Sequence, residues 1–377
     1  MRIRAAVLRQ MEVPRPYTES RPLRIEELTL DPPGEGEVLV RIAAAGLCHS
    51  DLSVIDGNRP RPLPMALGHE GAGVIAATGA GVRDFAVGDH VVLVFVPSCG
   101  RCRPCLEGRP ALCEPAAVAN GAGELIGGGR RLHDGNGEAI NHHLGVSCFA
   151  DHAVVSQNSL VKIDRRLPLD LAAVFGCAVL TGTGAVLNTA GVRPGEDVAV
   201  IGLGGVGLAA VLGAVLAGAR RIIAVDLLAE KRDLACSLGA TAAIDPMQDD
   251  AVQALRALTD GGVHHAIETA GSVRALEFAY AVTRRGGQTV TAGLAHPDHT
   301  LPLQQVSLVA EERTLKGSYI GSCVPGRDLP DYLALYEAGR LAVDRLISHR
   351  LRLEEINEGF ERLASGEAIR QVIVFDD

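Results

Sequence analysis

Residues 198–207 read VAVIGLGGVG, and this stretch decides the class of fold. Three glycines, Gly202, Gly204 and Gly207, follow an apolar, β-branched run and open an Ala/Leu-rich helical stretch. The first glycine permits a tight turn, the second lets the backbone approach a pyrophosphate, and the third lets helix and strand pack closely. The helix N-terminus then offers free N–H groups to the phosphates. The pattern predicts a dinucleotide site, with an ordinary strand–helix turn as the alternative.

An acidic residue downstream favours the dinucleotide interpretation. Asp226 ends the next β-branched run, 19 residues after Gly207, where a carboxylate accepts hydrogen bonds from the adenosine ribose. The same charge repels a 2′-phosphate, so NAD is favoured over NADP. Lys231 is close enough in sequence to reach this ribose, or it is an ordinary solvated helix charge.

Short β-branched runs alternate with helical stretches throughout residues 179–321. The expected strands are 198–202, 221–225, 242–245, 264–268 and 288–293, with helices of about 10–15 residues between them. Such alternation predicts an α/β domain with a doubly wound parallel sheet.

The flanking parts have a different character. Residues 37–47, 68–79 and 88–96 are typical of strands bounded by Gly, Pro or Asp, which predicts a β-rich, antiparallel and barrel-like body for residues 1–178. Residues 322–377 contain a helical segment at 353–366 and a final strand at 371–376. We expect this tail to return to the first domain, so that one domain is split around the other.

Composition excludes several classes of partner. The 377 residues carry a net charge of −9 and no basic block, which argues against nucleic acid or an anionic membrane. The only uncharged apolar run of 18 or more residues is the glycine-broken stretch at 198–219, and the N-terminus lacks the pattern of a leader. We expect a soluble, cytoplasmic protein.

Four cysteines lie within 17 residues, PSCGRCRPCLEGRPALC at 97–113, spaced C-x2-C-x2-C-x7-C. The last gap differs from the bacterial iron–sulfur pattern, and disulfides suit neither the short gaps nor a reducing compartment. Four thiolates favour a closed, tetrahedral structural zinc, the alternative being an unfilled site. The ligands are Cys99, Cys102, Cys105 and Cys113.

A second candidate set is dispersed along the chain. Cys48 lies in AAGLCHSD, His69 and Glu70 lie in GHEGAG, and Cys177 lies in VFGCAVLTG, each beside a glycine. Alone, each of these residues is more often structural than a ligand. Two cysteines and one histidine together would leave the fourth position of a zinc open, as in catalytic zinc sites.

The chain resembles the zinc-dependent alcohol dehydrogenases of the medium-chain dehydrogenase/reductase superfamily over nearly its whole length. The motifs GHEGAG, the four-cysteine lobe, GLGGVG with its downstream Asp, ERTLKGS and IRQVIVF fall in family order. The resemblance implies a GroES-like catalytic domain split around a Rossmann domain, with the active site in the cleft between them. The long connection from Cys113 to Cys177 is similar to the branch that includes glutathione-dependent formaldehyde dehydrogenases.

The resemblance also assigns roles to residues. Cys48, His69 and Cys177 would bind catalytic zinc; Glu70 would lie behind the metal and Asp51 would orient His69. Ser50 would relay the alcohol proton. The implied cofactor contacts beyond Gly202, Gly204, Gly207, Asp226 and Lys231 are His49, Thr181, Gly205, Val206, Leu294 and Arg370. The implied substrate pocket is Phe95, Val118, His143, Leu144, Leu294 and Tyr319.

The expected activity is reversible hydride transfer between a primary or aromatic alcohol and NAD, with two zinc ions per chain. The resemblance implies a homo-oligomer, a dimer being favoured over a tetramer, joined through the Rossmann sheet edge near residues 300–320. In many relatives a histidine ends the proton relay where this chain has Ser53, so we expect the relay to end on water or on His49. His143 replaces a commonly apolar side chain, either to recognise a polar substituent or simply to pack.

Two other functions compete with this one. Glutathione-dependent relatives use an arginine where this chain has Ala117, in CEPAAV, which disfavours oxidation of a thiol–aldehyde adduct. A non-catalytic NAD-binding relative is the third interpretation. The complete ligand set and Ser50 argue against it.

Overall fold

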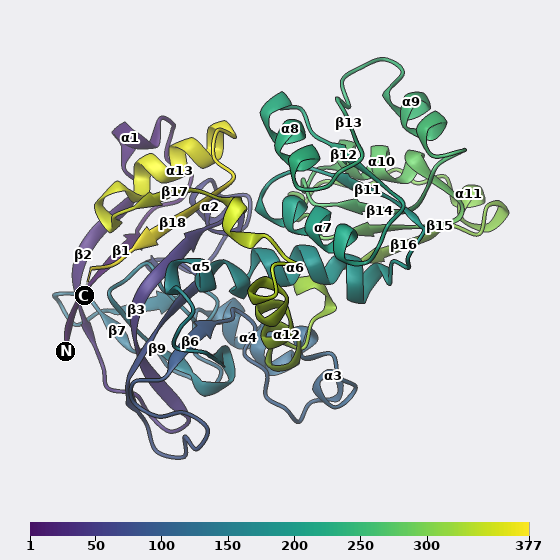
Figure 1. Ribbon diagram of the computed structural model, residues 1–377. Helices are drawn as coiled ribbons and strands as arrows, with labels where there is room; N and C mark the ends of the chain where they lie inside the picture. Colours follow the sequence, from purple (N-terminus) through teal and green to yellow (C-terminus); the bar gives the residue numbers. More distant parts are fainter. Residues whose placement is uncertain (377) are drawn as a thin grey trace. The chain divides into compact units, whose positions relative to one another are not determined.

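The structure is a computed structural model that describes residues 1–376 (Figure 1). The chain forms two compact units. The first contains Met1–Cys177, Val324–Pro330 and the residues from Ile347 onward, and the second contains Ala178–Cys323 and Asp331–Leu346. The return to the first unit is therefore interrupted, because residues 331–346, expected in the split domain, group with the second unit. Residue 377, the end of the expected tail segment, lies outside the described residues.

The first unit contains a small closed barrel in the strand order β1-β2-β7-β8-β4. Its strands are β1 (Arg2–Leu8), β2 (Leu23–Leu30), β4 (Met65–Ala66), β7 (Leu132–His133) and β8 (Ala139–His142). Ile3, Leu28, Leu132 and Ile140 belong to its buried apolar core. Strands of two residues carry too little pattern to be read from sequence, and none of β4, β7 and β8 was expected.

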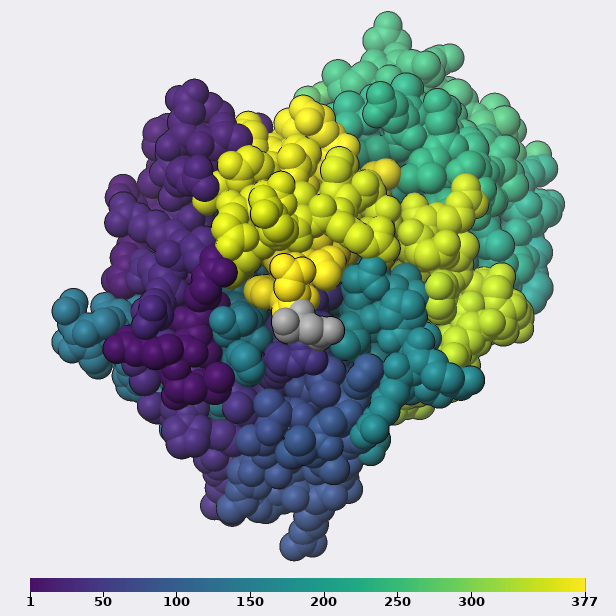
Figure 2. Space-filling model, turned by 60° about the vertical axis from the view of Figure 1, so that its left-hand side comes forward, coloured from purple at the N-terminus to yellow at the C-terminus, as the bar shows by residue number. Residues whose placement is uncertain are grey.

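A seven-stranded sheet completes the β structure of this unit, in the order β10-β6-β5-β3-β18-β17 with β9 also paired to β3. The strands are β3 (Glu37–Leu47), β5 (Gly71–Thr78), β6 (His90–Leu93), β9 (His152–Ser156), β10 (Leu160–Ile163), β17 (Ile347–Leu351) and β18 (Arg370–Val374). The C-terminal β18 pairs antiparallel with the early β3, Gln371 opposite Leu47. Figure 2 shows the C-terminal part, in yellow, beside N-terminal residues in purple.

The expected strand at 68–79 begins only at Gly71. Gly68 adopts a φ of 97°, and a Cβ there would lie 2.4 Å from the Phe149 nitrogen. A left-handed glycine pressed against another backbone cannot continue a strand. His69 and Glu70 therefore lie in a turn immediately before β5.

Short helices connect the strands of the first unit. They are α1 (Tyr17–Ser20), α2 (His49–Ile55), α3 (Arg103–Leu106), η1 (Pro110–Leu112), α4 (Glu114–Ala122), η2 (Gln157–Ser159), α5 (Leu169–Ala173), η3 (Val174–Gly176), η7 (Leu353–Glu355) and α13 (Ile356–Ser365). The helix α12 (Pro325–Glu337) runs through the boundary between the two units at Pro330.

The second unit is a six-stranded parallel sheet in the order β13-β12-β11-β14-β15-β16. Its strands are β11 (Asp197–Ile201), β12 (Arg221–Val225), β13 (Ala242–Ile244), β14 (Val263–Glu268), β15 (Thr283–Thr291) and β16 (Thr314–Gly317). This is the strand order of a Rossmann domain, in which the order of successive strands reverses beside the first strand, β11. The sixth strand, β16, was not among the expected ones.

Five helices connect successive parallel strands of this unit (Figure 1): α7 (Gly205–Leu216), α8 (Ala229–Ser237), α9 (Ala251–Leu258), α10 (Val273–Val282) and α11 (Gln305–Ala310). The helix α6 (Ala178–Gly184) and the π-helix η4 (Ala185–Ala190) precede β11, and η5 (Ile320–Ser322) and η6 (Val343–Leu346) follow β16. Residues of β11, β12 and β14 form a buried core with α9 and α10. The βαβ pattern expected from sequence is confirmed by this topology.

Among residues 1–376, no single helix is both long and apolar enough to cross a bilayer. One bent pair, Leu169–Gly176 with Ala178–Ala190, meets that criterion by length and composition only.

Candidate active site and metal centres

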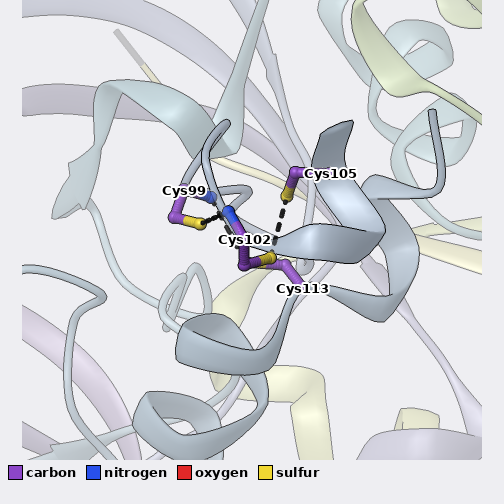
Figure 3. A group of neighbouring side chains, drawn as sticks. All are labelled: Cys99, Cys102, Cys105 and Cys113. Carbon is purple, nitrogen blue, oxygen red and sulfur yellow. Dashed lines mark hydrogen bonds between the residues drawn. The ribbon is translucent and has the colours of Figure 1, made fainter. Parts of the chain in front are cut away.

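The four cysteines of the 97–113 segment gather around one point (Figure 3). Their sulfur atoms all lie within 4.8 Å of one another, and the Sγ atoms of Cys102 and Cys105 are 3.5 Å apart. All four are free thiols. A tetrahedral zinc with Zn–S bonds of about 2.3 Å separates its sulfurs by about 3.8 Å, so the cluster has the size of a zinc site.

Backbone N–H groups already stabilise negative charge in this cluster. The amides of Arg101 and Cys102 donate to the Cys99 sulfur, at 3.5 and 3.2 Å, and they lower the pKa of Cys99 to about 6. The Cys99 amide donates to the Cys113 sulfur at 3.2 Å. Burial instead raises the pKa of Cys105 to about 12. A cation in the middle would stabilise all four thiolates, as structural zinc does.

The dispersed set also converges. Cys48, His69, Glu70 and Cys177 each direct a donor atom to one buried spot, with all four atoms within 4.8 Å of one another. Cys48 is the N-cap of α2, His69 and Glu70 precede β5, and Cys177 follows η3. Residues up to 129 positions apart in the chain are thus assembled by the first unit alone.

The chemistry of this donor set fits a metal ion. A hydrogen bond from Cys177, and His69 beside it, lower the pKa of the Cys48 thiol well below its usual value, whereas that of Cys177 is raised. Negative charge is thus stabilised at Cys48. The His69 Nε2 atom is buried and has no hydrogen-bond partner. An unpartnered imidazole nitrogen facing two cysteines is suited to bind zinc, whose binding would release the remaining thiol proton.

His69 is held from its other side. Its Nδ1 atom lies 3.0 Å from Asp51 Oδ1, and this carboxylate oxygen also accepts the Gly68 N–H at 3.2 Å. Both side chains are fully buried. A carboxylate on Nδ1 fixes the tautomer that leaves Nε2 free for the metal. The structure therefore places Asp51 against the Nδ1 side of His69.

Glu70 and Arg370 form a buried ion pair beside these ligands. Arg370 Nη1 lies 3.3 Å from Glu70 Oε2 and donates to the Leu47 carbonyl at 2.8 Å. Burial raises the pKa of Glu70 to about 7, opposed by Arg370. The adjacency of these two residues could not be read from the sequence, since β18 reaches this place only through its pairing with β3.

The predicted proton-relay residues lie at the start of α2. His49 is the first residue of the helix and is exposed, Ser50 is half-buried, and Asp51 is buried. The Ser53 hydroxyl donates to the His49 carbonyl at 2.8 Å. Ser53 is therefore bonded to its own helix, one turn back.

The glycine fingerprint in the second unit has the geometry of a dinucleotide turn. Gly202 has a φ of 89°. A Cβ on Gly207 would lie 1.8 Å from the Gly202 carbonyl oxygen, whereas a Cβ on Gly204 would meet no atom within 4 Å. Gly205 is the first residue of α7. The turn is thus closed on its protein side and open at Gly204, where a pyrophosphate would approach.

Asp226 is tied to this turn. Its Oδ2 accepts the Leu203 N–H at 2.7 Å, and its Oδ1 accepts the Leu228 N–H at 3.0 Å. Lys231 lies half-buried on α8. Helices α6 and α7 touch, since a Cβ on Gly182 would lie 2.1 Å from the Val206 carbonyl oxygen. Thr181 and Val206, two predicted nicotinamide contacts, therefore lie near each other.

The predicted pocket residues fall into three groups. Phe95, His143 and Leu144 are buried in the first unit, and the Phe95 and His143 rings both contact the His69 ring. Val118, on α4, is 74% exposed. Leu294 and Tyr319 belong to the second unit and are also exposed.

Two family models and a relative with a known activity match this chain. The model of the "Alcohol dehydrogenase GroES-like domain" matches residues 34–165, and that of the "Zinc-binding dehydrogenase" matches residues 205–338. An NDMA-dependent alcohol dehydrogenase of Amycolatopsis methanolica is 42% identical over 99% of both chains. The chain belongs to the zinc-dependent alcohol dehydrogenases of the medium-chain dehydrogenase/reductase superfamily. The family resemblance expected from the motifs is confirmed.

Two further proteins are similar over 95% or more of their own length. An S-(hydroxymethyl)glutathione dehydrogenase of Saccharomyces cerevisiae is 36% identical over 96% of this chain and 95% of its own. The crystal structure of benzyl alcohol dehydrogenase from Acinetobacter calcoaceticus superposes with a TM-score of 0.92, at 33% identity over 100% of both chains. The GroES-like and Rossmann fold class is confirmed, and the protein is an alcohol dehydrogenase acting on small-molecule alcohols or aldehydes.

Proposed function

We propose that the protein is an NAD-dependent enzyme that oxidises primary alcohols of medium size, including aromatic ones, and reduces the corresponding aldehydes. The observation that carries this proposal is the convergence of Cys48, Cys177 and the unpartnered His69 Nε2. Phe95 beside His69 offers an aromatic wall, and a benzyl alcohol dehydrogenase is among the similar structures. Asp226 supports NAD rather than NADP.

Zinc bound by these three residues would supply a Lewis acid that lowers the pKa of an alcohol. Asp51 keeps the His69 proton on Nδ1, so that Nε2 remains a ligand. Ser50 takes the alcohol proton and passes it to water or to His49, because the Ser53 hydroxyl is engaged with the His49 carbonyl. NAD, when bound at the glycine turn, would supply the hydride acceptor. His49, Arg370, Thr181, Val206 and Leu294 are its proposed further contacts.

The four-cysteine cluster would hold a second, structural zinc, giving two ions per chain. Nine free cysteines are consistent with a reducing compartment, and we place the protein in the cytoplasm.

The experiment for this function is a panel of alcohols, benzyl alcohol included, with NAD and with NADP, followed at 340 nm. Each assay is repeated with NDMA, the compound on which the 42% identical relative depends. The proposal expects NAD-linked oxidation, lost in Cys177→Ser. No alcohol-dependent reduction of NAD in a zinc-replete preparation contradicts it. If turnover is seen only with NDMA, then NDMA and not free NAD is the cosubstrate.

A thiol-adduct dehydrogenase is the second candidate, since one relative carries the name S-(hydroxymethyl)glutathione dehydrogenase. Ala117 lies exposed on α4 and offers no charge to a glutathione carboxylate. We therefore expect formaldehyde oxidation to be independent of added glutathione. Activity that requires the thiol would favour this candidate.

We further propose a homodimer joined through β16. This strand is at the edge of the parallel sheet, and α11 beside it exposes Val306 and Val309, the latter 75%. Pairing of two such edges would continue the sheet and cover both valines. Light scattering should show a dimer that dissociates in Val309→Asp but not in Val87→Asp, a matched change of an exposed valine in the first unit. A monomeric wild type contradicts the proposal.

A further inference from the structure

His143 lies in a backbone segment that leaves its side chain little freedom. It follows β8 directly, and its N–H donates to the Ser147 hydroxyl at 2.8 Å, which donates in turn to the Ala66 carbonyl at 2.7 Å. Leu144 and Ser147 both adopt a φ of 52°. Left-handed conformations of non-glycine residues cost about 1 kcal/mol or more and are kept where the surroundings fix them. The segment is thus rigid, and His143 is 1% exposed.

Three groups converge on a single oxygen atom. The Nδ1 atom of His143 lies 3.1 Å from Asp51 Oδ1, the atom that already faces His69 Nδ1 and the Gly68 amide. The His143 Nδ1 atom makes no hydrogen bond of regular geometry, so this contact with Asp51 is an electrostatic one. Two imidazole Nδ1 atoms thus face one Asp51 oxygen at close range.

The His143 ring also packs on the zinc-ligand candidate. Its centroid lies 5.4 Å from that of His69 at an interplanar angle of 88°, and Phe95 makes the same edge-on contact at 5.2 Å and 88°. His69 is thus held by two rings and one carboxylate. Of Phe95, Asp51 and His143, only His143 contacts both the His69 ring and the Asp51 carboxylate.

We propose that His143 is a positioning residue for the metal ligand His69, acting through the shared Asp51 oxygen rather than through substrate recognition. The inference rests on the proposed zinc site of Cys48, His69 and Cys177. The Nδ1 atom of His143, within ion-pair distance of Asp51 Oδ1, holds the Asp51 carboxylate in the orientation that keeps His69 Nε2 aimed at the metal. Partners of this kind commonly change metal affinity 10- to 100-fold when removed.

The test distinguishes the contribution of the His143 Nδ1 atom from that of the His143 ring. His143→Phe keeps an edge-on ring and removes the Nδ1 atom, whereas His143→Asn removes the ring and keeps an amide nitrogen near the Nδ1 position. Zinc release to a chelator is followed in both variants and in the wild type. The zinc whose release disappears in Cys177→Ser is assigned to the Cys48 site. We expect release at least about tenfold faster in His143→Phe and near the wild-type rate in His143→Asn.

A second readout reports the ligand field directly. With Co²⁺ in place of zinc, the visible bands that vanish in Cys177→Ser belong to this site. They should shift in His143→Phe and return to the wild-type position in His143→Asn. A role in packing alone predicts the opposite ranking, with Phe close to the wild type and Asn perturbed, and that result overturns the inference.

The controls are the zinc of the four-cysteine cluster in each variant and the zinc count of the wild type. The four-cysteine zinc should remain in every variant, which shows that the first unit is folded. If a variant loses this zinc, His143→Gln is used in its place. One zinc per chain in the wild type would remove the proposed function itself. Two zinc ions with unchanged release and unchanged cobalt bands in His143→Phe would overturn only the role of His143.

Discussion

At the scale of single residues, the site depends on side chains whose partners are remote in sequence. The types and positions of Cys48, His69 and Cys177 could be inferred from the sequence because metal ligands have few alternatives and family motifs surround them. The contact of His143 with Asp51 could not, because nothing in NHHLGVS indicates which way a buried histidine faces. The strongest sequence signal for a special role of His143 is that a polar side chain stands where related proteins commonly have an apolar one.

Asp226 allows a prediction about cofactor choice. Asp226→Asn keeps the side-chain shape and an oxygen for the Leu203 N–H, but removes the charge facing a 2′-phosphate. We expect kcat/KM with NADP, relative to NAD, to rise at least about tenfold, corresponding to ~1.4 kcal/mol of relieved repulsion. Asp233→Asn, the same charge change at an exposed position on α8, is the control and should leave the ratio unaltered. An unchanged ratio in Asp226→Asn would contradict the assigned role.

At the scale of elements, local pattern and structure agree best where a mainly apolar run is paired with a neighbouring strand on both edges. β3 runs over Glu37–Leu47 and β12 over Arg221–Val225, the ranges expected from their apolar runs. The two-residue strands of the barrel and the edge strand β16 were missed. Their pairing is decided by partners far along the chain, and their own residues carry little period-two pattern.

The glycine turn between β11 and α7 gives a matched pair of substitutions. Gly207→Ala places a methyl group 1.8 Å from the Gly202 carbonyl, so the turn must open; we expect a loss of about 3 kcal/mol or more and a clear fall in Tm. Gly204→Ala meets no protein atom within 4 Å, and its Tm should stay within a degree or so of the wild type. Its NAD affinity should nevertheless fall, because the added methyl group occupies the pyrophosphate approach. Calorimetry and NAD titration of both variants decide this; full NAD binding by Gly204→Ala is incompatible with the proposed site.

At the scale of the whole molecule, the change of pattern near residue 179 predicts that the chain divides into two units. It does not predict which C-terminal segments belong to which unit. The sequence signals mark where βαβ repetition begins and ends. They do not show that residues 331–346 group with the second unit, because that assignment rests on packing between segments far apart in sequence. For the same reason β18 had to be seen paired with β3 before Arg370 could be placed beside Glu70.

We propose that this chain holds two zinc ions of different kind, one of them at Cys48, His69 and Cys177. Elemental analysis of zinc per chain, in the wild type and in Cys177→Ser, tests it most directly. We expect two ions in the wild type and one in the variant, the four-cysteine ion being retained. A wild type with one zinc, or a Cys177→Ser variant that keeps two, would contradict it.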